Sequence, residues 1–247
     1  MNQIQMAPLT PTVKKVLIAM AAIWIVVQIV LDRFLHLNLS TWFILHPDHV
    51  VERFWIWQTF TYIFFHALSP LHILFNGLML WLVGAELEKH WGTRFFTVYF
   101  LTCGIGAGFV YCIGVALYAL VTGDKTPLII PVMGASGALF GLLVAYGIVF
   151  SERVIYFMGL FPLKAKYFAL IAAALDFSSL LTSGIAGTEV ASLAHLGGAL
   201  VGFVFLWAHT RIKLGKTRSK IRKQTGLRLV VDNEKTGKED KGPKYWN

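Results

Sequence analysis

Charged residues are scarce in this chain. Asp, Glu, Lys and Arg make up 14% of its 247 residues, whereas a soluble domain carries roughly 25%. Hydrophobic residues account for 56%, and the mean hydropathy is +0.64. The apolar residues form continuous runs, unlike the short alternating segments of a membrane β-barrel. The composition therefore excludes an ordinary soluble domain and predicts an all-α polytopic membrane protein.

Cysteine is also rare, with only Cys103 and Cys112 present. They lie nine residues apart in one apolar run, which is about 13 Å along a helix and too far for a disulfide. The chain lacks an HExxH motif and any cluster of cysteines, the patterns that commonly hold zinc. We expect no disulfide framework, no metal and no cofactor.

Six apolar runs are long enough, with their flanking residues, to cross a bilayer as helices. They cover residues 16–31, 71–87, 95–121, 132–150, 167–181 and 190–208. These runs predict a six-helix membrane domain over residues 1–210, with an uncleaved first helix. The stretch 154–166 contains Pro162 and two lysines, and we expect it at the membrane interface before the fifth helix.

The first outer connection, residues 32–70, is long and rich in Trp and Phe. Aromatic side chains favour the headgroup region of a bilayer. We therefore expect this connection to lie in the interface. Long ordered loops of this kind are more often functional than short ones.

Lysine and arginine are concentrated on one side of the predicted membrane domain. The segment 211–247 holds twelve of them against four acidic residues, a balance of +8 out of the chain's +9. The other basic connections precede the first run, follow the second and follow the fourth. By the positive-inside rule both termini are predicted to be cytoplasmic, with residues 211–247 as a basic tail that contacts anionic lipid. Nucleic acid is the less favoured partner for this tail.

Polar residues lie near the outer ends of three inward-running helices. His72 and Asn76 share one face of the second helix at i and i+4, Ser136 lies in the fourth, and His195 lies in the sixth. A rise of 1.5 Å per residue places all four roughly 3 to 10 Å below the outer boundary. Each alone is typical of a packing residue, but their common depth favours a shared site.

Glycines follow both the serine and the histidine at GxxxG spacing, as Gly137 and Gly141 after Ser136, and Gly198 and Gly202 after His195. This spacing lets helix backbones approach closely, which a short serine side chain needs in order to reach a histidine.

Serine becomes a nucleophile when a base removes its proton, and histidine is the usual base. The oxyanion that forms needs hydrogen-bond donors, which an Asn amide, a His N–H and the unpaired backbone N–H of Ser136 at a helix start can supply. Asp176, toward the outer end of the fifth run, and Glu189 are the acidic residues nearest in sequence to the sixth helix, and both are taken to lie at its outer connection. We therefore expect a serine–histidine dyad with no carboxylate beside it.

Three motifs together resemble the rhomboid intramembrane serine proteases. They are "HILFN" from His72 to Asn76, "GASG" around Ser136, and "AHLGGALVG" from Ala194 to Gly202, with "GAELEKHWG" and "FPLKAKY" in the expected order. GxSG alone is weak, because unrelated hydrolases share it. The ordered set covers roughly two thirds of the chain and is specific.

The resemblance implies that Ser136 is the nucleophile, that His195 is the general base, and that His72 and Asn76 stabilise the oxyanion. Phe140 corresponds to an aromatic residue, often tyrosine, that packs on the base. This sequence departs from the family pattern at two positions. Phe140 has no hydroxyl, and Trp57-Gln58 stands where the family usually has Trp-Arg.

The resemblance also implies substrates that are single-pass transmembrane proteins, cleaved at or near the outer membrane face. The fifth helix and the loop before the sixth would gate their lateral access. A prokaryotic plasma membrane is expected, with an organelle inner membrane as the alternative. Two other functions remain open: a non-cleaving pseudoprotease, which usually lacks the serine or histidine kept here, and a transporter or metal-binding channel using His66, His72 and His195.

Overall fold

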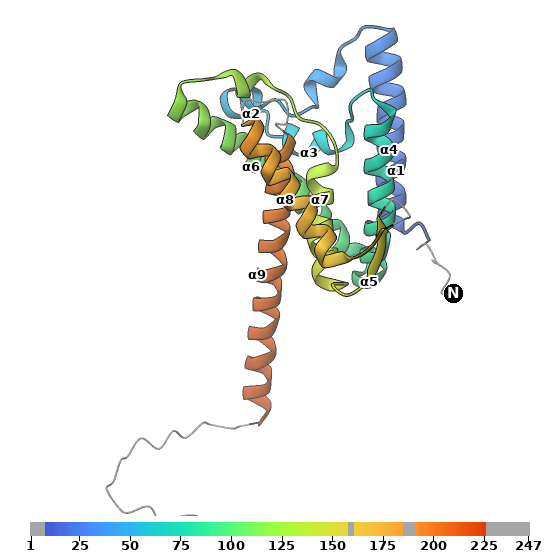
Figure 1. Cartoon of the computed structure of the whole chain (residues 1–247), viewed down its shortest axis with the longest axis vertical. Helices are drawn as coiled ribbons and strands as arrows, with labels where there is room; N and C mark the ends of the chain where they lie inside the picture. The colour runs from blue at the N-terminus through green and yellow to red at the C-terminus, as the bar shows by residue number, and fades with distance from the viewer. Residues whose placement is uncertain (1–7, 158–160, 185–190, 226–247) are drawn as a thin grey trace, which may run out of the picture. The chain divides into compact units, whose positions relative to one another are not determined.

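The computed structural model describes residues 8–157, 161–184 and 191–225, and most of their regular structure is helical (Figure 1). The chain divides into two units at the boundary between Trp207 and Ala208. The first unit contains all the residues predicted to form the site. The predicted tail is described only as far as residue 225, and its residues 226–247 lie outside the described part.

Within the described residues, five helical stretches are long and apolar enough to cross a membrane. The first is α1 (Pro11–Ala22) continued by η1 (Ile23–Phe34), which has π-helical hydrogen bonding, and the second is α4 (Pro70–Met79), η4 (Leu80–Gly84) and α5 (Ala85–Trp91) in succession. The others are α6 (Thr93–Thr122), α8 (Ala165–Ser183) and the part Ala191–Gly215 of α9 (Ala191–Thr225). The predicted polytopic helical membrane protein is confirmed.

The first helix begins earlier than predicted, at Pro11. Proline suits the first position of a helix because its missing N–H would be unpaired there. The next backbone N–H groups are capped from a distant helix: the Glu88 carboxylate of α5 accepts from Thr12 at 2.9 Å and from Val13 at 3.0 Å. Two helices far apart in sequence are thereby joined.

The fourth predicted span is shorter than expected. Its helix, α7 (Ser136–Val149), has 14 residues, or about 21 Å at 1.5 Å per residue, against a hydrocarbon core of about 30 Å. The predicted start at Val132 is wrong, because Val132 instead exchanges two backbone hydrogen bonds with Leu45 at 2.9 and 3.1 Å. Gly134 then has φ +128, which no helix accommodates, so the helix begins at Ser136.

The outer connection 32–70 contains η2 (Leu39–Trp42), α2 (Pro47–Arg53), α3 (Gln58–Thr61) and η3 (Tyr62–Phe64). Gln58 is fully buried within it. Its Oε1 accepts from the His46 N–H at 3.0 Å, and its Nε2 donates to the Trp42 carbonyl at 3.4 Å. Gln58, which stands where the resemblance implies an arginine, therefore has hydrogen-bond partners of its own within this connection.

A small β-hairpin fills the stretch expected at the interface. Strands β1 (Val154–Phe157) and β2 (Phe161–Lys164) pair antiparallel, with Val154 opposite Lys164. Residues 158–160 between them lie outside the described part. These strands were not predicted from the sequence. A short 3₁₀ turn, η5 (Thr126–Ile129), lies between α6 and α7 and was not predicted either.

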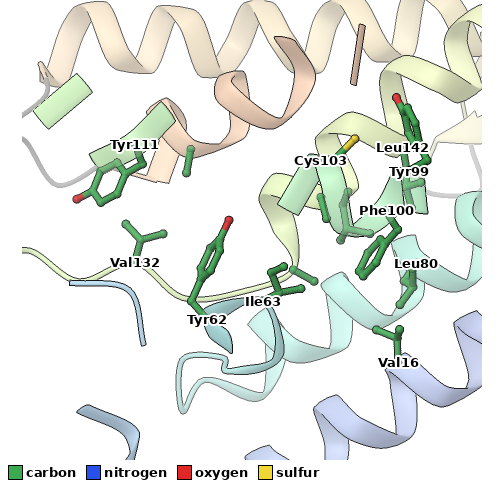
Figure 2. Packing of buried hydrophobic residues seen from close by; sticks show 14 of the residues in the cluster. Val16, Tyr62, Ile63, Leu80, Tyr99, Phe100, Cys103, Tyr111, Val132 and Leu142 are labelled. Atoms are coloured by element: carbon green, nitrogen blue, oxygen red, sulfur yellow. The ribbon is translucent and has the colours of Figure 1, made fainter. Parts of the chain in front are cut away.

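Helix α7 lies inside the first unit, in contact with α4, α6 and α8 (Figure 1). Nine of its 14 residues are buried. Figure 2 shows Leu142 of α7 close to Tyr99 and Cys103 of α6, in a cluster that continues to Leu80 and Val16. The helix that begins with Ser136 is therefore packed against helices that precede it and a helix that follows it in the sequence.

Candidate active site

Ser136 and His195 are hydrogen-bonded to each other. Ser136 is the first residue of α7, and its Oγ lies 2.8 Å from Nε2 of His195. His195 lies four residues after the first residue of α9. Both side chains are partly exposed, which a group that must meet a substrate requires.

Glycines set the distance between α7 and α9. A Cβ atom on Gly198 would overlap the carbonyl oxygen of Gly137, and a Cβ on Gly202 would lie 3.0 Å from the Cα of Gly141. At Gly137 a Cβ would lie 2.7 Å from the Ala107 side chain of α6. The two helix backbones are thus in direct contact along the face where the serine meets the histidine.

Phe140 fixes the plane of the histidine ring. Its own ring is stacked on that of His195, with centroids 4.5 Å apart and planes inclined by 7°. Phe140 is one turn after Ser136 on the same helix, so one element supplies both the hydroxyl and the aromatic face.

The other nitrogen of His195 contacts a carboxylate. Its Nδ1 lies 3.0 Å from Oδ1 of Asp176, so the expectation that no carboxylate lies beside the pair is wrong. Asp176 lies inside α8, seven residues before its last residue, Ser183, and not in a connection. Two consecutive helices can bring residues together when both residues lie near the connection that joins the helices. Asp176 near the end of α8 and His195 near the start of α9 meet this condition. Glu189, the other acidic residue considered, lies outside the described residues.

His72 has an N–H donor at its ring nitrogen Nε2, on the side of Gly134. Its Nδ1 accepts the backbone N–H of Ala67 at 3.1 Å, so in the neutral ring the proton is on Nε2. A Cβ on Gly134 would lie 3.2 Å from that Nε2 and 3.7 Å from the Ser136 Oγ. The missing glycine side chain therefore leaves a space bordered by an N–H donor and by the hydroxyl.

Asn76 is buried one turn after His72, on the face that the i, i+4 spacing predicted. One hydrogen of its Nδ2 bonds the His72 carbonyl at 2.8 Å, which leaves the second hydrogen of the amide. Its Oδ1 has no hydrogen-bond partner among the described residues. The amide therefore lies one turn from His72 with part of its hydrogen-bonding capacity unused.

Two further residues support the loop that leads to His72. His66 is fully buried, and its Nε2 accepts a long hydrogen bond of 3.4 Å from the Ala135 N–H, directly before Ser136. Burial lowers the pKa of His66 to about 4, so the ring is neutral at pH 7. Gln28 of η1 bonds the backbone of His66 in both directions, at 2.7 and 3.0 Å. A buried glutamine inside an apolar run was the signal that could have identified this support.

The Rhomboid domain family matches residues 53–212 of the chain, which is more than half of it. The chain belongs to the rhomboid family. This matched region contains Ser136, His195, His72, Asn76 and also Asp176.

Several named rhomboids are similar in sequence. RHOMBOID-like protein 1 of Arabidopsis thaliana is 33% identical over 165 residues, covering 64% of this chain and 36% of the relative. Rhomboid protease GluP of Bacillus subtilis (strain 168) is 30% identical over 151 residues, covering 60% and 25% respectively. Rhomboid protease GlpG of Yersinia enterocolitica is 26% identical over 205 residues, covering 81% and 63%. The chain therefore spans between a quarter and two thirds of the length of these relatives.

Proposed function

We propose that this rhomboid is an intramembrane serine endopeptidase with Ser136 as nucleophile and His195 as general base. The observation that carries the proposal is the 2.8 Å contact between the Ser136 Oγ and the His195 Nε2, formed where two helices touch through glycines. The names of the bacterial relatives, rhomboid proteases, support the same activity.

The reaction would follow the general course of acyl transfer by an activated serine. The Ser136 oxygen attacks the carbonyl carbon of the scissile peptide while its proton passes to the His195 Nε2. His195 then gives that proton to the leaving amine as the C–N bond breaks, which leaves an ester on Ser136. Water, deprotonated by the same nitrogen, hydrolyses the ester and restores the serine.

The oxyanion of each tetrahedral intermediate would lie in the space beside Gly134. Its donors are the Nε2–H of His72, the backbone N–H of Ser136 and the remaining amide hydrogen of Asn76. The first N–H groups of a helix have no intrahelical partner and attract negative charge. Preorganised donors of this kind are worth about 3 to 4 kcal/mol each in acyl-transfer enzymes.

The substrate class that fits is a single-pass transmembrane protein cut at or near the outer membrane face. A membrane helix hides its carbonyls in internal hydrogen bonds, so the substrate must unwind before attack. Lateral access would pass α8 and the loop before α9, of which residues 185–190 lie outside the described part. Both termini would be cytoplasmic, with the basic tail on anionic lipid. A prokaryotic plasma membrane suits this arrangement, although the relatives include plant proteins.

Cleavage in a reconstituted membrane tests the activity. The chain and a labelled single-pass substrate with small residues at its outer end would be placed together in lipid vesicles. We expect cleavage by the wild-type protein and none by Ser136→Ala or His195→Ala at equal folded amounts. Cleavage that persists in either variant, or no cleavage of any such substrate by the wild-type protein, would contradict the proposal.

Locking the proposed gate tests the access route separately. A covalent cross-link between α4 and α8 should stop cleavage of the transmembrane substrate. If the cross-linked protein cleaves it at the normal rate, access does not pass between these helices.

A further inference from the structure

His195 is held from two sides. Its Nε2 faces the Ser136 Oγ at 2.8 Å, and its Nδ1 faces the Asp176 Oδ1 at 3.0 Å. The three residues come from three different helices: Ser136 from α7, Asp176 from α8 and His195 from α9. The side chains of His195 and Asp176 keep only 19% and 16% of their exposure. The contact is therefore largely shielded from water.

A carboxylate beside Nδ1 decides which nitrogen carries the proton. A neutral imidazole has one N–H donor and one acceptor nitrogen, whereas a carboxylate can only accept. The hydrogen bond to Asp176 therefore requires the proton on Nδ1, and this leaves Nε2 free to take the proton of Ser136. The opposite tautomer would point an N–H at the hydroxyl and could not act as a base.

Phe140 and Asp176 constrain the ring in different ways. The stacked Phe140 ring fixes the plane of the imidazole, but a half-turn about the Cβ–Cγ bond keeps that plane while exchanging the Nδ1 edge for the Cδ2 edge. A hydrogen bond along one edge removes this freedom, because only one orientation directs Nδ1 at the carboxylate. Together the two contacts define both the plane and the edge that faces Ser136.

We propose that Asp176 is a positioning residue of the protease, so that Ser136, His195 and Asp176 form a triad in place of a dyad. This inference rests on the proposed function. When the proton leaves the Ser136 Oγ for Nε2, the ring becomes an imidazolium, and the Asp176 carboxylate stabilises its charge. Asp176 itself takes no proton, and Nε2 later passes the proton to the leaving amine.

A purely structural role is the competing explanation, in which the contact only ties α8 to α9. The two roles differ in what they predict for a small serine-reactive probe. Such a probe reports the reactivity of Ser136 without needing a transmembrane substrate to pass α8. A positioning residue changes the labelling rate of folded protein, whereas a tie between helices changes its thermal stability.

The experiment compares labelling by a fluorophosphonate and cleavage of a transmembrane substrate in the full chain. Asp176→Asn should lower the labelling rate and kcat together by at least about 10-fold, with an upper bound of about 10⁴-fold as in buried triads. KM should change by less than about threefold, because ground-state binding is untouched. Asp176→Glu should recover part of the loss. Ser178→Asn, which places the same amide on an exposed part of α8 two residues away, should behave as wild type.

Chemical rescue provides a second and independent variant. Asp176→Ala removes the carboxylate, and added formate should increase its labelling rate in a saturable way, relative to chloride at equal ionic strength. Formate should not accelerate the wild-type protein or Ser178→Asn. This test also decides the question if Asp176→Asn does not fold.

The inference is overturned if Asp176→Asn labels within about twofold of wild type, or if only KM rises. It is equally overturned if the variants are slow and less stable while neither Glu nor formate restores the rate. In both cases the proposed function still stands if the wild-type protein is labelled and Ser136→Ala is not. A folded wild-type protein that never labels removes both proposals.

Discussion

Helices α7 and α8 contact each other and both contribute to the site, yet they are packed very differently. Nine of 14 residues are buried in α7, whereas Ala165 alone is buried among the 19 residues of α8. Large apolar side chains of α8 are exposed: Leu170, Leu175 and Leu181 are 65 to 69% exposed. The proposed nucleophile thus starts a well-packed helix, and the proposed positioning carboxylate lies on a loosely packed one.

The difference separates two requirements of an intramembrane protease. The nucleophile and its oxyanion donors must be held rigidly, and α7 provides this through close contact with α6 and α9. A substrate helix must also reach the site, and a helix with few buried side chains can move at low cost. Because Asp176 lies on α8, a displacement of that helix would also release His195, which links substrate access to alignment of the base.

Among substitutions where α7 packs against α6 and α9, one at Gly198 should cause the largest loss of activity. Gly198→Ala places a methyl group against the Gly137 carbonyl, so the backbones of α7 and α9 must separate. We expect activity to fall about 100-fold or more, since a shift of about 1 Å can cost that much, and the thermal unfolding temperature to fall with it. Gly215→Ala, where a Cβ meets nothing within 4 Å on the same helix, is the matched control. Equal behaviour of the two variants would show that the close contact is unimportant.

The proposed oxyanion site includes the buried Asn76 of α4. Asn76→Ala removes one amide donor, and we expect kcat to fall by about 10- to 1000-fold. The labelling rate by a fluorophosphonate should fall in parallel while the protein stays folded. A wild-type kcat in this variant would exclude Asn76 from oxyanion stabilisation.

The buried His66 should make the stability of the folded protein sensitive to acid. Burial holds the pKa of His66 at about 4, below its value of about 6.5 in the unfolded chain. Between these values the unfolded state binds more protons, so the free energy of unfolding should fall by about 3 kcal/mol as pH drops from 6.5 to 4. His66→Gln removes the titrating ring and should reduce this fall, as measured by thermal unfolding at pH 7.5 and pH 4.5. An unchanged difference between the two pH values would contradict this role.

The smallest expected effect is at the contact between ring faces. Phe140→Leu loses the stacking on His195, which is worth about 0.5 to 1.5 kcal/mol, so the labelling rate should fall about 2- to 10-fold. Phe140→Tyr keeps the ring and should retain the wild-type rate. A Leu variant as fast as the Tyr variant would mean that Asp176 alone holds the imidazole.

The sequence predicted the apolar helices well because continuous hydrophobic runs are a strong local signal. It predicted their ends less well: the start of α1 depends on capping by Glu88, and the start of α7 depends on the Leu45–Val132 pairing. The hairpin 154–164 was missed because its strands are four residues long and carry no clear alternation. Each of these features depends on partners distant in the sequence.

The candidate site shows the same division. Common depth favoured a shared site for Ser136, His195, His72 and Asn76, and the resemblance of their motifs to the rhomboid proteases then led to their selection. Asp176 was missed because its contact with His195 depends on how α8 packs on α9, which periodicity does not reveal. Gln58 could not be evaluated either, since its role lies in backbone hydrogen bonds to a loop.

The most direct measurement of the central claim is covalent labelling of the folded chain with a fluorophosphonate, followed by mass spectrometry of the labelled peptide. We predict one adduct on the Ser136 oxygen, lost in Ser136→Ala and in His195→Ala. A folded wild-type protein that remains unlabelled, or an adduct that survives the Ser136→Ala substitution, would contradict the account.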